Sequence, residues 1–218
     1  MILEGKQLFK SYGELKVLKG IDISIDKGEI VSIVGASGAG KSTLLHILGT
    51  LDDSDAGDIF IKGENVTKLN SNQLAKFRNV NIGFVFQFHN LLPEFSALEN
   101  ICIPGFIGKL NTEEVERKAL KLMELLGIAD RKDNKPSELS GGEQQRASVA
   151  RALINDPEIV FADEPSGNLD SKNANELHEL FFRLRKELNQ TFVIVTHNEQ
   201  LAQMADRKLE IMDGLIVK

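Results

Sequence analysis

The 218-residue sequence predicts an α/β fold, and three observations lead to this prediction. Short apolar runs rich in β-branched and aromatic residues, at 30–34, 159–162 and 192–196, are typical of strands buried on both faces of a mostly parallel sheet. Helical patterns lie between these runs, as parallel strand pairing requires. Extended segments with turn signals stand apart from this alternation. We therefore expect a mostly parallel sheet covered by helices, with a small antiparallel β subdomain.

The antiparallel sheet is expected from two extended segments, residues 1–28 and 57–66. They contain turn signals at Asp26-Lys27-Gly28 and at Lys62-Gly63-Glu64, where the chain is expected to turn sharply. We expect this sheet to lie on the parallel core. Near the carboxyl end, Asp213-Gly214 predicts a terminal hairpin of two short strands.

Four helices are expected from apolar residues at helical spacing, at residues 43–51, 113–126, 143–155 and 172–188. The region from about residue 90 to residue 155 is mainly helical and separates a strand-like run at 82–86 from the next strand. We therefore expect it to form an inserted α-helical subdomain. The whole chain is expected to form a single domain, because its length suits one substantial core.

The composition excludes several classes of protein. Hydrophobic residues make up 42% and charged residues 27%, which excludes a disordered chain, a collagen and a disulfide scaffold. The formal net charge of -6 argues against a nucleic-acid partner and against a basic membrane-surface protein. The single cysteine, Cys102, cannot form an internal disulfide, and no apolar run approaches the length of a membrane span. We expect a cytoplasmic protein without direct membrane insertion.

The loop after the first of these strands carries a phosphate-binding motif. The pattern G-x-x-x-x-G-K-[ST] is satisfied by Gly35, Ala36, Ser37, Gly38, Ala39, Gly40, Lys41 and Ser42, with Thr43 next in the expected helix. Such a loop binds phosphates through inward-facing N–H groups and the helix dipole, while the lysine reaches the terminal phosphates and the serine binds Mg²⁺. The alternative is a structural glycine-rich turn, but the motif stands between a strand and a helix, as phosphate binding requires. The loop predicts binding of a nucleoside triphosphate.

Polar residues that suit hydrolysis follow the predicted strands. Asp163 and Glu164 end one strand, at the edge where open α/β sheets place their ligands. Asp163 suits Mg²⁺ held through water, and Glu164 suits polarisation of the water that attacks the γ-phosphate. His197 and Gln87 each end another strand and are candidates for contact with the γ-phosphate, the water or Mg²⁺. Taken alone, a strand-end histidine is more often structural, and an isolated loop glutamine is a weak signal.

A second glycine-containing motif, Leu139-Ser140-Gly141-Gly142-Glu143, opens the helix expected at 143–155. One interpretation is purely structural, because a serine followed three residues later by a glutamate forms a capping box. Capping alone does not require two glycines. The other interpretation is an anion site, formed by a serine hydroxyl and bare backbone at a helix amino terminus.

Together, these motifs resemble those of the nucleotide-binding subunits of ABC transporters, over essentially the whole chain and in the family order. The resemblance implies a RecA-like P-loop NTPase core that uses ATP and Mg²⁺ and hydrolyses ATP. It implies that Tyr12 stacks on adenine, although a surface aromatic is the structural alternative. It assigns hydrolysis to Glu164, His197 and Gln87, and it places the metal at Ser42, Gln87 and Asp163.

The same resemblance implies a homodimer of ATPase subunits around ATP. In that family the signature residues of one subunit, here Ser140, Gly141 and Gly142, contact the γ-phosphate bound to the other. Glu143 stands where glutamine is commoner. We expect little loss from this departure, because the first four signature positions carry the phosphate contact.

Residues 88–100, after Gln87, indicate the partner. In ABC ATPases a coupling helix of an integral membrane subunit docks here, and Phe88, Leu91, Leu92 and Phe95 suit such a contact, although some of them also suit the core. The run resembles ATPases of lipoprotein-releasing complexes. The implied function is to drive, from the cytoplasmic face of the inner membrane, a membrane partner that releases lipoproteins. ATPases of macrolide exporters and of the cell-division complex are the alternative.

Three other classes of protein share some of these motifs. Soluble ABC ATPases of translation or DNA repair usually carry two cassettes or a long coiled-coil insert, for which 218 residues leave no room. A P-loop kinase or GTPase lacks the Ser-Gly-Gly signature. A module that binds ATP without cleaving it is expected to lose Glu164 or His197, and both are present.

Overall fold

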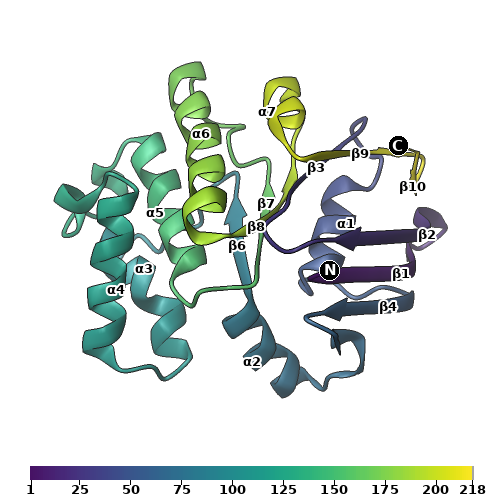
Figure 1. Cartoon of the computed structure of the whole chain (residues 1–218), viewed down its shortest axis with the longest axis horizontal. Coiled ribbons are helices and arrows are strands. Elements are labelled where there is room, and N and C mark those ends of the chain that lie inside the picture. The colour runs from purple at the N-terminus through teal and green to yellow at the C-terminus, as the bar shows by residue number, and fades with distance from the viewer. Residues whose placement is uncertain (218) are drawn as a thin grey trace.

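The centre of the structure is a six-stranded, mostly parallel sheet (Figure 1). The computed structural model describes residues 1–217. The strand order is β10-β9-β3-β8-β7-β6, and only the pairing of β10 with β9 is antiparallel. The strands are β3 (Ile30–Val34), β6 (Ile82–Phe86), β7 (Ile159–Asp163), β8 (Thr191–Val195), β9 (Arg207–Met212) and β10 (Leu215–Ile216). The expected strands and the terminal hairpin at Asp213-Gly214 are confirmed, with ends that shift by at most one residue.

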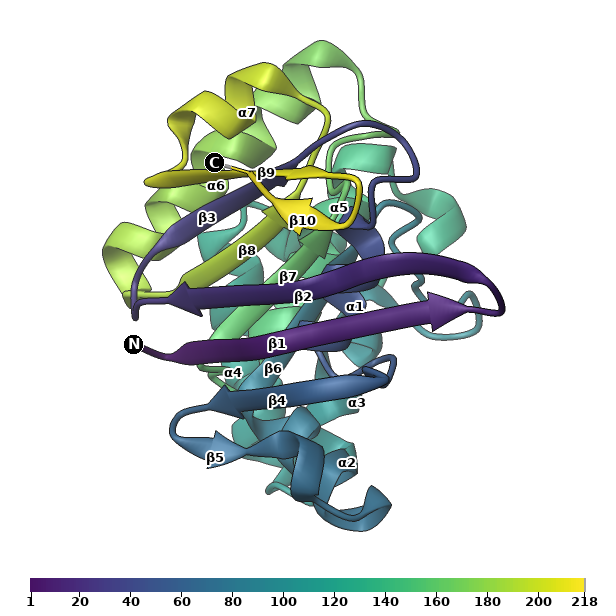
Figure 2. The ribbon, with the colours of Figure 1, turned by 90° about the vertical axis from the view of Figure 1, so that its right-hand side faces the viewer.

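A second, four-stranded sheet is antiparallel, as expected, in the order β2-β1-β4-β5. It consists of β1 (Leu3–Tyr12), β2 (Leu15–Ile25), β4 (Ala56–Ile61) and β5 (Glu64–Asn65). Figure 2 shows these strands in front of the parallel sheet. The turn at Lys62-Gly63 closes the β4–β5 hairpin, whereas the turn at Asp26-Lys27-Gly28 leads the chain from β2 in this sheet to β3 in the parallel one.

Seven α-helices surround the sheets in the described part of the chain. They are α1 (Lys41–Leu48), α2 (Ser71–Asn81), α3 (Ala97–Ile107), α4 (Thr112–Leu125), α5 (Gly141–Leu153), α6 (Ser171–Leu188) and α7 (Glu199–Met204). The four expected helices are found with ends shifted by at most three residues, and α3 lies in the region expected to be helical, whereas α2 and α7 were not predicted. Across residues 1–217, none of these helices combines the length and the apolar character that crossing a membrane requires.

The two faces of the parallel sheet are covered by different elements, because successive strand residues point to opposite faces. Val160 and Ala162 pack with α3, α4, α5 and α6, whereas Ile159 and Phe161 pack with α1 and the antiparallel sheet. Figure 1 shows the first group of helices on the left of the central strands and the antiparallel sheet on the right. The inserted helices share their hydrophobic cluster with the sheet, and we infer that they fold together with it as one unit.

Substitution of Phe161 tests the packing of this core. Phe161 is fully buried at the centre of β7, and its ring stacks on that of Phe84 in the neighbouring strand. We expect Phe161→Ala to lower the free energy of unfolding by about 3–5 kcal/mol, because the change leaves a cavity in close-packed surroundings. Urea titration followed by circular dichroism measures this.

The control for this experiment is Phe88→Ala, the same substitution at a side chain that is 73% exposed. It is expected to leave the unfolding midpoint nearly unchanged. A loss of less than about 1 kcal/mol in Phe161→Ala would contradict the packing described here.

Candidate nucleotide-binding site

The phosphate-loop residues wrap between the end of β3 and the start of α1. Gly40, the amino-terminal cap of α1, has φ 101°, which favours glycine. At Gly35 an added Cβ would lie 2.2 Å from the carbonyl oxygen of Ile211, so the close approach of β9 also requires glycine. The Lys41 Nζ donates to the carbonyls of Gly35 and Ala36 at 3.0 Å each. The lysine ammonium therefore lies over the loop at the positive end of the α1 dipole.

Asp163, the last residue of β7, lies against the start of α1. Its Oδ1 accepts a hydrogen bond from the Ser42 hydroxyl at 3.0 Å, and its Oδ2 lies 3.4 Å from His46 Nε2. Ser42 and His46 are four residues apart, so they share one face of α1. Sequence reasoning paired Ser42 with Asp163 through a metal but missed His46, which the i, i+4 spacing from Ser42 could have indicated.

Glu164 and His197 meet beyond the ends of the adjacent strands β7 and β8. Glu164 Oε2 lies 2.8 Å from His197 Nδ1 and accepts the His197 backbone N–H at 3.2 Å. The Glu164 backbone has φ 46°, and its N–H donates to the carbonyl of Val195. Strained conformations of this kind occur at functional sites. Here the conformation turns the chain sharply after β7 and directs the carboxylate to the neighbouring loop.

Gln87, directly after β6, is joined to the loop after β7. Its Nε2 donates to Asn168 Oδ1 at 3.0 Å, and Asn168 Nδ2 donates to the Gln87 carbonyl at 3.1 Å. A Cβ at Gly167 would lie 2.9 Å from Gln87 Nε2, so glycine leaves room for this pair. Sequence reasoning did not identify Asn168 as the partner, since 81 residues separate it from Gln87.

Tyr12 lies at the end of β1, half exposed, and its hydroxyl donates to Asp52 Oδ2 at 2.5 Å. The other carboxylate oxygen of Asp52 pairs with the buried Lys10 at 2.8 Å. The hydrogen bond to Asp52 raises the pKa of the Tyr12 hydroxyl, and Lys10 is the main cause of a lowered pKa at Asp52. The tyrosine is thus fixed from one end while its ring stays accessible. Sequence reasoning missed Lys10 and Asp52.

The signature residues lie elsewhere on the molecule. Ser140 caps α5, and Gly141 and Gly142 are the first residues of that helix. Helix α5 packs on the face of the parallel sheet opposite to α1. The structure therefore brings Ser42 together with Asp163, and Glu164 together with His197, at the edge of the sheet that carries the phosphate loop. Gln87 lies on the neighbouring loop, and the signature glycines lie beside Leu169 and Asn173.

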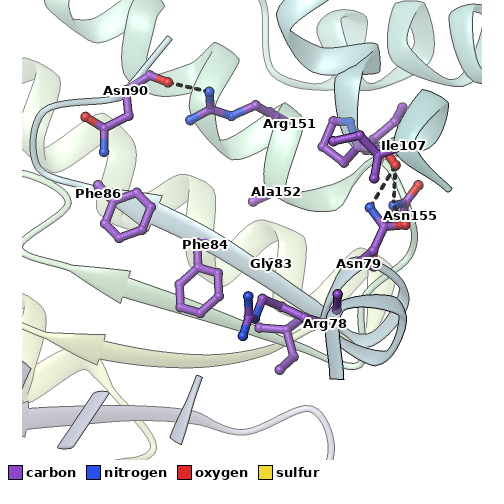
Figure 3. A pocket seen from close by; sticks show the side chains of 14 residues that line it. Arg78, Asn79, Gly83, Phe84, Phe86, Asn90, Ile107, Arg151, Ala152 and Asn155 are labelled. Atoms are coloured by element: carbon purple, nitrogen blue, oxygen red, sulfur yellow. Dashed lines mark hydrogen bonds between the residues drawn. The ribbon is translucent and has the colours of Figure 1, made fainter. Parts of the chain in front are cut away.

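A separate groove of about 470 Å³ lies between α2, β6, α3 and α5 (Figure 3). Phe84, Phe86 and Ile107 line it together with two arginines. One of these, Arg151, donates to the carbonyls of His89 and Asn90 at 2.6 Å each. These bonds hold the chain that leaves Gln87 against α5.

The segment predicted to contact a membrane partner begins beside this groove. Phe88, Leu92 and Phe95 are 73%, 44% and 41% exposed, whereas Leu91 packs on the core. The buried Asn100 accepts from the Leu92 N–H and donates to the carbonyls of Leu92 and Phe95. A buried amide therefore fixes a turn that displays two apolar side chains on the surface.

The comparisons with known proteins agree with this arrangement. The family described as ABC transporter matches residues 18–167. The chain belongs to the ABC transporter family and is one of its ATP-binding subunits, as the motifs predicted.

Two relatives share the name lipoprotein-releasing system ATP-binding protein LolD. The protein of Cytophaga hutchinsonii is 62% identical over 99% of both chains. The protein of Bacteroides thetaiotaomicron is 58% identical over 99% of this chain and 98% of its own. Among solved structures, the dimeric bacterial ABC transporter cassette MJ0796 aligns with a TM-score of 0.90 and 38% identity, over 100% of this chain and 97% of the other. The α/β ABC ATPase fold is thereby confirmed.

Lys41→Ala tests the phosphate loop. We expect tight ATP binding to be lost, by at least about tenfold in Kd, because hydrogen bonds to charged groups contribute about 1.5–3 kcal/mol each. Titration with a fluorescent ATP analogue measures the Kd. The control is Lys76→Ala, an exposed lysine of α2, which is expected to bind normally. Equal affinity in the two variants would contradict a role for Lys41.

Proposed function

We propose that the chain is the ATPase of a lipoprotein-releasing ABC transporter and converts ATP binding and hydrolysis into work on a membrane partner. The observation that carries the chemistry is the convergence of Lys41, Ser42, Asp163, Glu164 and His197 at the carboxyl edge of the parallel sheet. The observation that supports the substrate class is the name shared by relatives 48–62% identical over 95–99% of this chain.

Each residue at the edge of the sheet has a distinct task. Lys41 neutralises charge on the terminal phosphates, and the loop N–H groups hold the remaining oxygens. Glu164 polarises the attacking water. His197 lies against the Glu164 carboxylate, orients the water and contacts the γ-phosphate. Tyr12 stacks on the adenine ring, which contributes on the order of 1–3 kcal/mol and discriminates weakly between bases.

The same edge suits Mg²⁺. Ser42 and Asp163 place a hydroxyl and a carboxylate oxygen 3.0 Å apart, and oxygen is the ligand type that Mg²⁺ prefers. Mg²⁺ usually keeps several waters and is held by one or two protein oxygens together with nucleotide phosphates. Ser42, Asp163 and Gln87 would hold the ion, which supplies charge neutralisation at the phosphates.

A second copy of the chain completes the site. The signature opens α5, which packs on the opposite face of the parallel sheet from α1, so Ser140, Gly141 and Gly142 serve a nucleotide bound to a partner. A helix amino terminus with bare glycine backbone suits a phosphate. The dimeric description of the MJ0796 cassette supports this assembly. Two ATP molecules are then held between two copies.

The membrane partner docks at the groove and the exposed turn that follow Gln87. Its cytoplasmic segment covers Phe88, Leu92 and Phe95, whose exposure is otherwise unfavourable. Gln87 stands between this surface and Asn168, so a displacement of the docked segment reaches the loop after Glu164. The chain thereby acts at the cytoplasmic face of the inner membrane, attached through its partner.

Glu164→Gln tests the catalytic step. The amide keeps the size of the side chain but polarises water poorly, so we expect ATP to drive formation of a dimer that persists because hydrolysis no longer opens it. Size-exclusion chromatography with light scattering, with ATP and without it, measures the change. A variant that binds ATP and stays monomeric would count against Glu164 as the catalytic base and against the dimer.

Phe95→Asp and Leu92→Asp test the docking surface. We expect each to separate the ATPase from its membrane partner and to abolish lipoprotein release, while basal ATP hydrolysis and Tm stay unchanged. Copurification from membranes and a melting curve measure both effects.

The matched control for docking is Leu215→Asp, because Leu215 is 44% exposed, like Leu92, but lies on β10. Equal loss of copurification in all three variants would show that the added charge, and not the surface, is responsible. A large fall in Tm would instead mean that the side chain is needed for packing.

A further inference from the structure

Glu143 places a negative charge in the signature itself. Its Oε2 accepts the backbone N–H of Ser140 at 2.7 Å and the Ser140 hydroxyl at 2.7 Å. The carboxylate stabilises the start of α5 through the helix dipole. The same charge opposes an incoming phosphate, and the hydroxyl that would donate to that phosphate is already engaged.

Arg131 faces the other side of this carboxylate. Its Nε lies 2.7 Å from Glu143 Oε1, and the arginine comes from the short 3₁₀ turn Ala129–Arg131, which follows α4. One carboxylate oxygen of Glu143 therefore binds Arg131, and the other accepts both hydrogen bonds from Ser140. Asp130 also approaches Arg131, at 3.3 Å from Nη1, but it belongs to the same turn and does not contact α5 residues through any described hydrogen bond or ion pair.

The charge on Glu143 persists at neutral pH. The hydrogen bond from Arg131, followed by those from Ser140, lowers the pKa of Glu143 to about 2. Protonation therefore does not remove the repulsion between this carboxylate and a phosphate. Among the ion pairs of residues 1–217, Arg131 is the cation in contact with Glu143.

We propose that Arg131 is a positioning residue for the signature: it neutralises Glu143 and weakens its hold on the Ser140 hydroxyl, so that Ser140 can donate to the γ-phosphate bound to a second copy. This inference rests on the proposed ATP-dependent dimer. It also explains how glutamate is tolerated here. An uncharged glutamine at position 143 would have no need of Arg131, because its amide oxygen can cap the helix without repelling phosphate.

The test is a double-mutant cycle in the hydrolysis-deficient Glu164→Gln protein, with the ATP concentration at half-maximal dimer formation as the readout. We expect Arg131→Ala to raise this concentration at least about tenfold, since an unpaired carboxylate then faces the phosphate. Adding Glu143→Gln to Arg131→Ala is expected to restore it to within about threefold of the parent. Lys132→Ala, which removes the same charge from the next residue, is expected to have no effect.

The other outcomes contradict the inference, and they show whether the proposed dimer or the role of Arg131 is wrong. A parent protein that does not dimerise with ATP contradicts the proposed dimer and, with it, this inference. A parent that dimerises together with an unaffected Arg131→Ala contradicts the inference alone. If Glu143→Gln does not rescue the dimerisation defect of Arg131→Ala, Arg131 has a structural role. The same conclusion follows if Arg131→Ala lowers the Tm and Glu143→Gln does not restore it.

Discussion

The hydrogen bond between Ser42 and Asp163 joins the phosphate loop to the acidic end of β7. The rest of the site depends on the parallel strand pairing that brings these two residues together. Strands β3 and β7 run in the same direction on either side of β8, so the loops that follow them leave the sheet at one edge. Asp163 ends β7 and Ser42 opens α1, and their oxygens meet at 3.0 Å although 121 residues separate them. Parallel pairing therefore assembles a site that no local segment contains.

The same sheet also separates functions. Its two faces carry different hydrophobic clusters, with α1 behind one and α5 behind the other. The helix that follows the phosphate loop and the helix that opens with the signature therefore pack on opposite faces of one sheet. We propose that each copy offers half of a site on each side, so that nucleotide binding and association of two copies are the same event. In this proposal, the hydrogen-bonded pair of Gln87 and Asn168 links that event to the apolar turn held by Asn100.

Much of the fold could be predicted from the sequence because its buried strands are short, strongly apolar and followed by polar residues. Helix α2 escaped prediction because it buries only Phe77 among its residues and so lacks an apolar stripe. Its start is nevertheless marked by the reciprocal hydrogen bonds of Asn70 and Gln73, a capping box that propensity alone does not weigh.

Motif recognition found the residues of the phosphate loop and of the strand ends, because each stands at a set distance from a neighbour in the chain. It missed the residues that hold them. Lys10 and Asp52 hold Tyr12, Asn168 holds Gln87, and Arg131 holds Glu143. Apart from Lys10 and Tyr12, which share a strand, each of these residues is 12 to 81 positions from the residue that it holds. A periodic sequence pattern does not encode pairs at such separations.

We propose that the carboxyl edge of the parallel sheet is half of a site that a second copy completes. The most direct test is a crystal structure of the Glu164→Gln protein with ATP and Mg²⁺. We expect a two-fold dimer in which the Ser140 hydroxyl of one copy lies within hydrogen-bond distance of the γ-phosphate held by Lys41 of the other. A nucleotide enclosed by one copy alone, or a dimer with both signatures facing solvent, would contradict it.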